Sequence, residues 1–317
     1  MSGRSAHNCI GEAVAIILDD EGEKNMAGKT TKDMTSGSPM KLILGFMIPM
    51  LFGFLFQQFY NMMDTIIVGK YLGVTALAAV GSTGSINFMI IGFCNGVCSG
   101  FAIPVAQKFG EKNESAMRRY VANSGWLAAV FAVVMTVVVC LLCRNIQTWM
   151  RTPEDIFDQA YIYIFIIFLG IPATFLYNYF ASLLRAVGNS VVPLVFLAVS
   201  AVLNILLDLL FVVVFPWGVT GAAATVLSQF VSGIGIMVYY ALRFPALRVK
   251  RSHMRWDASI LREITSLSLL TCIQQSVMNL GILLVQGLIN SFGTVIMAAF
   301  AAAVKIDAFA YMPVQDF

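Results

Sequence analysis

Charged residues are scarce in this sequence. Only 12% of its 317 residues are Asp, Glu, Lys or Arg, whereas 59% are hydrophobic. A typical soluble domain carries about 25% charged residues, because its surface faces water. The composition therefore excludes an ordinary soluble domain and predicts an all-α polytopic membrane protein.

The sequence also has little of what transition-metal sites are made from. Its two histidines, His7 and His253, lie far apart, and most of its six cysteines fall in apolar segments. Cys94 and Cys98 are four residues apart on one predicted helix, but two thiols do not complete a zinc site. We interpret the cysteines as small core residues rather than as metal ligands or disulfides.

Motifs for catalysis and nucleotide binding are missing as well. The segment GKT at 28–30 resembles part of a phosphate-binding loop, but Glu23 stands where such a loop needs glycine. A GxSxG nucleophile motif is absent, and no GxGD pattern surrounds Asp208. We expect a protein that is not an enzyme, has no cofactor and no nucleic-acid partner, and takes energy from a source other than ATP.

Long apolar runs dominate what is present. After a polar tail at 1–40 come eight segments of the length that a bilayer requires. They lie near 41–68, 84–105, 124–142, 160–183, 191–215, 218–242, 264–289 and 294–317. We predict an amino-lobe bundle of six helices at 41–243, a basic linker at 244–262, and the first two helices of a second bundle at 263–317.

Basic residues are distributed unevenly between the predicted loops. Alternate loops carry most of the Lys and Arg, while the others have only Lys70, Arg144 and Arg151. Positive charge marks the cytoplasmic side of a membrane protein. We therefore predict a multi-pass protein of the cytoplasmic membrane, with its amino terminus and the linker at 244–262 inside.

An internal repeat links the two predicted bundles. The glutamine pair at 57–58 recurs at 274–275, and the glycine and alanines of 73–79 recur at 293–299. An even number of spans separates the copies, so the repeats would be parallel and related by an axis along the membrane normal. Because the second copy stops after about two helices, we expect further helices beyond 317 and no transport by these residues alone.

One acid lies inside the first apolar segment. Gln57, Asn61 and Asp64 are spaced i, i+4 and i+7, which forms one polar stripe on a helix. A carboxylate at a bilayer centre costs about 2.5–3.5 kcal/mol, so Asp64 should face protein or water. It would bind a cation or a proton there, or serve as a structural hydrogen-bond partner for another helix.

A second acid, Asp208, lies in the fifth segment, with Asn204 one turn before it. At about 1.5 Å per residue, Asp64, Asp208 and Thr225 all fall roughly 7–11 Å inside the outer boundary. Two carboxylates, an amide and a hydroxyl at one depth predict a site for Na+ or a proton. The alternative is two separate acids on different faces, each satisfied by its own neighbours.

Glycines and prolines indicate where helices pack closely or bend. Gly92, Gly96 and Gly100 form a GxxxGxxxG pattern, which permits close approach of a neighbouring helix. Pro49 lies in the helix that carries Asp64, and its missing N–H predicts a point at which that helix bends.

Three further charged residues lie in the predicted second bundle. Glu263 sits beside Arg262 at the inner end of the seventh segment, and we interpret it as a solvated interfacial acid. Lys305 and Asp307 in the eighth segment are two residues apart and do not share a helix face. Either could pair with a residue beyond 317.

Several segments together resemble the multidrug and toxic compound extrusion (MATE) transporters, in the bacterial branch of the DNA-damage-inducible F proteins. They are the helix QQFYNMMDTIIVG, the loop LGVTALAAVGSTGS, and the segments SGFAIPVAQKFG, LLRAVGNS, NILLDLLF and GVTGAAATVLSQ. The resemblance implies two six-helix lobes in a V that export drugs or organic cations in exchange for Na+ or H+ by alternating access.

The resemblance also implies that Asp64, Asn204, Asp208 and Thr225 form the coupling site of the amino lobe. Another branch of the family carries an acid in the middle of its seventh helix. Here that region reads SLLTCIQQSVMN and has no carboxylate, so we expect no coupling site in the second lobe. We expect small organic cations as substrates and a monomer in the bilayer.

Two other transport classes remain open. A lipid-linked precursor flippase of the same superfamily should carry basic residues in mid-membrane, and the amino lobe has almost none. A channel is the other class, although an acid pair in two repeat-related lobes fits alternating access better.

Overall fold

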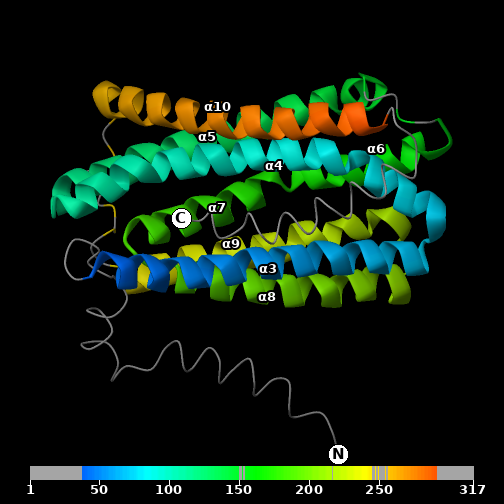
Figure 1. The fold of residues 1–317 in the computed structure, drawn as a ribbon, viewed down its shortest axis with the longest axis horizontal. Helices are drawn as coiled ribbons and strands as arrows, with labels where there is room; N and C mark the ends of the chain where they lie inside the picture. The colour runs from blue at the N-terminus through cyan, green and yellow to red at the C-terminus, as the bar shows by residue number, and fades with distance from the viewer. Residues whose placement is uncertain are drawn as a thin grey trace, which may run out of the picture.

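The structure is a computed structural model that describes residues 38–149, 152, 154–215, 217–244, 247, 249, 254 and 256–290. Every regular element in this part of the chain is a helix, and the helices lie lengthwise beside one another (Figure 1). The all-α prediction is confirmed. The tail at 1–37 and the predicted eighth segment, with Lys305 and Asp307, lie outside the described residues.

Eight α-helices make up the described bundle. They are α3 (Pro39–Tyr71), α4 (Gly73–Gly110), α5 (Glu114–Trp149), α6 (Glu154–Leu169), α7 (Ile171–Ala186), α8 (Val191–Leu209), α9 (Ala223–Arg243) and α10 (Ala258–Asn290). A π-helical turn, Leu210–Val214, extends α8, and a 3-10 helix, Gly218–Ala222, precedes α9. By length and apolarity the described helices provide five membrane spans, or six if the bent pair α6 and α7 is one span.

Several helices extend well beyond their apolar stretches. α4 begins at Gly73 rather than near 84, so the prediction of a loop at LGVTALAAVGSTGS is wrong. The Ser82 and Thr83 hydroxyls, which would suit a turn, instead donate to the Ala79 and Val80 carbonyls within the helix, each at 2.8 Å. Only Leu72 separates α3 from α4, and Gly73, the first residue of α4, has a φ of 84°, which glycine adopts without strain.

The fourth predicted span is broken in the middle. α6 ends at Leu169, α7 begins at Ile171, and their axes differ by 42°. Pro172 has no N–H to continue the helix. A Cβ on Gly170 would lie 2.5 Å from the Val226 side chain, so glycine lets α9 approach at the break.

The main apolar core lies among α4, α5, α6, α7 and α9, and it reaches the first half of α10. In contrast, α3 lies at the edge of the bundle, packs mainly on α8, and buries only Gly53, Ile67 and Val68. It continues through Pro49 as one helix. Its remaining apolar surface is available to lipid or to further helices.

The first helix of the predicted second bundle packs on α4. A Cβ on Gly100 would lie 2.4 Å from the Ser268 Cα, and one on Gly96 would lie 3.3 Å from the Cys272 Cα. The Thr271 hydroxyl donates to the Gly96 carbonyl at 3.0 Å. The close packing predicted from the glycine pattern is confirmed at Gly96 and Gly100.

Candidate ion-coupling site

A small cavity lies near the end of the bundle that holds the carboxyl end of α3. Its walls come from α3, α4, α6, the end of α8 and the 3-10 helix. The residues that line it are Asp64, Ile67, Val68, Leu72, Val80, Tyr163, Asp208, Val212, Gly218, Val219, Gly221 and Ala222. The cavity has a volume of about 10 Å³ within reach of the centre of a water molecule, so it has room for about one water.

Both intramembrane acids line this cavity, although they come from different helices. Asp208 of α8 is 3% exposed, and Asp64 of α3 is half-buried. The structure thus places the two carboxylates at one site, rather than on separate faces of the bundle.

Asn204 connects Asp208 to α9. Its amide orientation follows from its neighbours. With Nδ2 toward Asp208, it donates to the carboxylate at 2.9 Å, and Oδ1 accepts from the Thr225 hydroxyl at 3.2 Å. The opposite orientation would place Oδ1 against the carboxylate oxygen, so the first is favoured. Asn204 is 1% exposed and Thr225 is 8% exposed, which keeps this network out of lipid and water.

Two residues of the predicted polar stripe lie elsewhere. Gln57 is half-buried and Asn61 is exposed, and neither lines the cavity. The structure does not bring them to the acid pair. Spacing on α3 defined a face of the helix, but the neighbouring helices cover only part of that face.

Two tyrosines outside the predicted polar stripe adjoin the site instead. Tyr163 of α6 lines the cavity and is 8% exposed. Tyr60 lies one turn before Asp64 on α3, and its hydroxyl interacts with Thr225. Tyrosine reads as apolar in a hydropathy pattern. Its position four residues from Asp64 was the signal that could have identified Tyr60.

The backbone around Asp208 is irregular. The π-helical turn Leu210–Val214 follows it directly, and such turns often occur at functional sites. A Cβ on Gly221 would lie 2.9 Å from the Val212 side chain, so glycine allows the 3-10 helix to close this end of the cavity.

The donor set limits what the site can hold. Within the described residues, no three His, Cys, Asp or Glu side chains come close enough to bind a metal ion. Two carboxylates with neutral oxygens nearby fit a proton or a monovalent cation better than a transition metal.

The fold and the sequence agree on one family. The family model described as MatE matches residues 49–210, which is just over half of the chain. The chain belongs to the MatE family. The matched part of this MatE chain includes both acids and Asn204, while Thr225 and α10 follow it.

Individual relatives support the assignment. The chain is 28% identical to the "Probable multidrug resistance protein YpnP" of Bacillus subtilis (strain 168), over 89% of this chain and 63% of that protein. It is 30% identical to the "Probable multidrug resistance protein YoeA" of the same organism, over 84% of this chain and 60% of that protein. The chain therefore spans less than two thirds of the length of these curated relatives.

A solved structure shows the same fold. A MOP superfamily transporter from Pyrococcus furiosus superposes with a TM-score of 0.81 and 25% sequence identity, over 88% of this chain and 62% of that one. The relatives are described as transporters or resistance proteins, not as enzymes. By family and by its apolar helices, this chain is a multi-pass membrane protein.

Proposed function

We propose that this MatE protein is a secondary antiporter that exports small organic, mainly cationic, compounds across the cytoplasmic membrane in exchange for Na+ or H+. The observation that carries the proposal is the cavity shared by Asp64 of α3 and Asp208 of α8, with Asn204 joining Asp208 to Thr225.

The energetics of the acid pair explain why it would couple to an ion. Two close carboxylates in a small space with low dielectric cannot both ionise cheaply without a counter-charge. Binding one proton or one Na+ would reduce the repulsion between the two carboxylates. For Na+, Asn204 would turn Oδ1 toward the cavity and Thr225 would supply a hydroxyl oxygen, both of which are ligand types that suit hard cations.

The position of α3 explains how binding of an ion or a proton at the acid pair could change the conformation of the protein. Asp64 is anchored at the site, but most of α3 is not buried in the bundle. Pro49 lacks the N–H that would hold the helix at that point. When Asp64 exchanges its partner, α3 has little packing to lose, because it buries only Gly53, Ile67 and Val68, and we expect it to move or bend.

The positions of the basic residues argue against the flippase alternative. Within the described residues, Lys and Arg lie at or near the ends of the helices rather than in their middle. An anionic lipid-linked precursor would require positive charge to replace its lost hydration. The proposal of cation export therefore fits the described part of the bundle better.

The test is dye efflux from membrane vesicles that contain the full-length protein, under separately imposed Na+ and pH gradients. Asp64→Asn and Asp208→Asn should each lower gradient-driven efflux by about tenfold or more, because each removes a charged partner of the ion. The double variant should be little worse than either single variant, because the acids act as a unit.

The matched control is Asp158→Asn, the same chemical change at an exposed acid on α6. It should export at the wild-type rate at equal expression in the membrane. Wild-type export by either single acid variant under both gradients would contradict the shared site. Strictly additive losses would show that the two acids work separately.

A further inference from the structure

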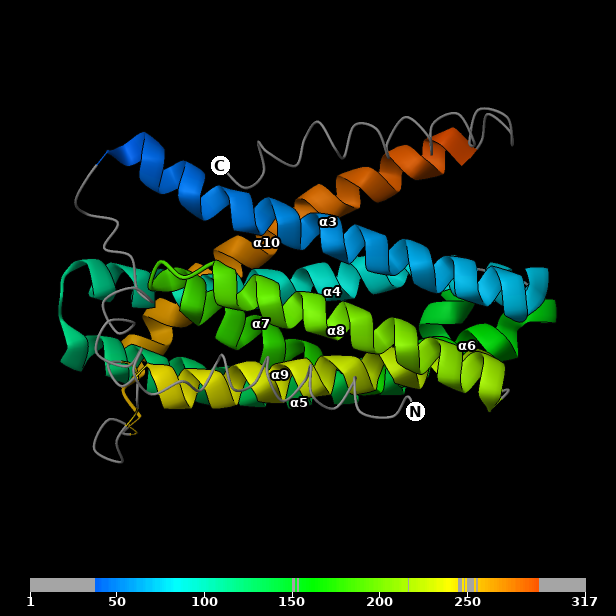
Figure 2. The ribbon, with the colours of Figure 1, turned by 90° about the horizontal axis from the view of Figure 1, so that it is seen from below.

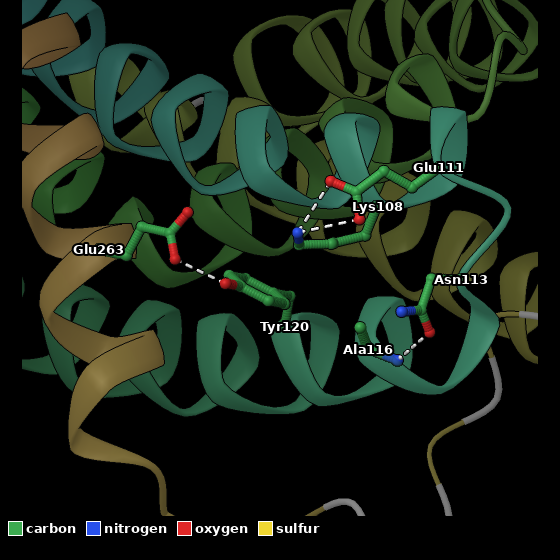
Figure 3. A network of polar contacts seen from close by, with 6 residues as sticks. All are labelled: Lys108, Glu111, Asn113, Ala116, Tyr120 and Glu263. Carbon is green, nitrogen blue, oxygen red and sulfur yellow. Dashed lines mark hydrogen bonds and ion pairs between the residues drawn. The ribbon is translucent and has the colours of Figure 1, made fainter.

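The end of the bundle opposite the acid pair holds polar contacts between α10 and the amino lobe. Tyr120 of α5 is 7% exposed, and its hydroxyl donates to the Glu263 carboxylate of α10 at 2.5 Å (Figure 3). These residues are 143 positions apart in the chain. The bond therefore fastens the start of α10 to α5.

A second contact lies one turn away along α5. The Asp257 backbone N–H donates to Asn123 Oδ1 at 3.3 Å. Asn123 is 2% exposed, and its Nδ2 donates to the Arg119 carbonyl at 2.9 Å, which fixes the amide. Both contacts use a buried side chain of α5 and a group at the start of α10.

The tyrosine is itself held in place. Lys108 of α4 lies 5.9 Å from the centre of the Tyr120 ring, and its ammonium pairs with Glu111 at 2.9 Å (Figure 3). The ring thus packs between α4 and α10, with its hydroxyl directed at Glu263. Removing the hydroxyl alone would leave this packing intact.

Water reaches these contacts from one side. An open groove of about 710 Å³ lies between the end of α4 and the start of α10, lined in part by Gln107, Arg262 and Glu263. Separation of α10 from α5 would therefore expose polar groups to solvent rather than to hydrocarbon, which keeps its cost low.

Along its first half α10 also packs on α4, and the described side chains beyond that half are more exposed. Past the contact of Cys272 with the Phe93 carbonyl, Val277 and Leu280 are exposed, and a Cβ on Gly281 would meet nothing within 4 Å. Figure 2 shows α10 crossing α4 and leaving the bundle toward its carboxyl end. Among the described side chains of α10, the hydrogen bonds to other helices lie between Glu263 and Cys272.

We propose that the Tyr120–Glu263 and Asn123–Asp257 contacts form a latch that holds the start of α10 on the amino lobe and that opens when this end of the transporter opens. The role of this opening in transport rests on the proposed function. The latch itself is tested by thiol reactivity, which does not depend on transport.

Cys272 is a native reporter of the latch. It is 3% exposed and its thiol faces α4, so it should react only when α10 separates. Cys143 of α5 is 0% exposed inside the amino lobe and reports general unfolding. Peptide mass spectrometry reads the two thiols separately after labelling with N-ethylmaleimide, so the native cysteines can stay.

Tyr120→Phe should raise the labelling rate of Cys272 about tenfold, the effect of losing a hydrogen bond to a charged group. Glu263→Gln keeps an acceptor at the same place and should raise it only about threefold, because a neutral bond is roughly half as strong. Cys143 should label at the wild-type rate in both variants.

Tyr179→Phe provides the matched control. Its hydroxyl also belongs to a buried tyrosine, but it donates to the Val121 carbonyl within the amino lobe at 2.9 Å. It should leave the labelling of Cys272 unchanged. An unchanged Cys272 rate in Tyr120→Phe, or an equal rise at Cys143, would overturn the latch.

Discussion

Asp257 shows how one side chain sets the start of a helix. The seventh apolar segment begins near 264, yet α10 begins at Ala258. Asp257 Oδ1 accepts from the Ser259 hydroxyl at 2.6 Å and from its N–H at 3.0 Å, so the carboxylate caps the first turn. A helix boundary outside the membrane follows such local bonds rather than apolarity.

The same bonds predict a dependence of α10 on pH. The hydrogen bonds from the Ser259 hydroxyl and N–H hold the pKa of Asp257 below its ordinary value of 3.8. A depressed pKa means that the carboxylate stabilises the folded state above pH 3.8, and that this contribution fades as the pH falls through the lower folded value. Hydrogen-exchange protection of the amides at 258–261, corrected for intrinsic rates, should therefore drop below pH 3.8.

Asp257→Asn serves as the comparison at this position. Its amide oxygen still caps the helix but does not titrate in this range. Protection should then stay constant across the same pH interval. An identical drop in this variant would assign the pH dependence to another group.

At the scale of an element, α4 has two kinds of glycine. Gly96 and Gly100 face α10 at close range, while a Cβ on Gly84 would meet nothing within 4 Å. Gly84 lies outside the GxxxGxxxG pattern at 92–100. The neighbouring helix α10 decides which glycines of α4 have no room for a side chain.

This difference predicts opposite effects of one substitution within one helix. Gly100→Ala should lower stability by about 1–3 kcal/mol, because its Cβ would collide with the α10 backbone. Gly84→Ala should be neutral or stabilising by about 0.5–1 kcal/mol, because alanine restricts the unfolded chain more than glycine does. Thermal denaturation of both variants in the same detergent gives the comparison. Equal shifts would mean that α10 does not pack on α4 as described.

At the scale of the whole molecule, the two ends of the bundle hold different groups of polar residues. The acid pair lies near one end and the α5–α10 contacts lie near the other. Basic-residue asymmetry predicts that the acid pair is nearer the outside and that α10 begins inside. This orientation is a prediction, because the geometry of the bundle does not indicate which end faces the cytoplasm.

Impermeant thiol labelling of intact cells tests the orientation. Lys70→Cys lies at the end of α3 near the acid pair, and Gly110→Cys lies at the opposite end, where a Cβ meets nothing within 4 Å. In a background without native cysteines, only Lys70→Cys should label before the cells are broken. Labelling of Gly110→Cys in intact cells would reverse the topology.

The sequence by itself determined the class of the protein and predicted one membrane depth for its two acids. Apolar runs of about 20 residues predicted helical spans, because a helix satisfies its backbone hydrogen bonds within one such segment. A fixed rise per residue placed Asp64 and Asp208 at one depth because helix geometry does not depend on neighbours. Family motifs then added what similar residues do in related chains.

Only the tertiary structure decided which groups meet. Residue spacing within α3 predicts a polar stripe on one face of the helix, but it does not predict which neighbouring helix packs against that face. The cavity therefore adjoins Tyr163, and Tyr60 reaches Thr225, while Gln57 and Asn61 lie away from it. Likewise, nothing in the sequence near Glu263 indicates Tyr120, because that contact depends on how α10 crosses the bundle. The rotation of each helix and the angle at which helices cross result from packing over the whole bundle. Local sequence patterns therefore do not predict them.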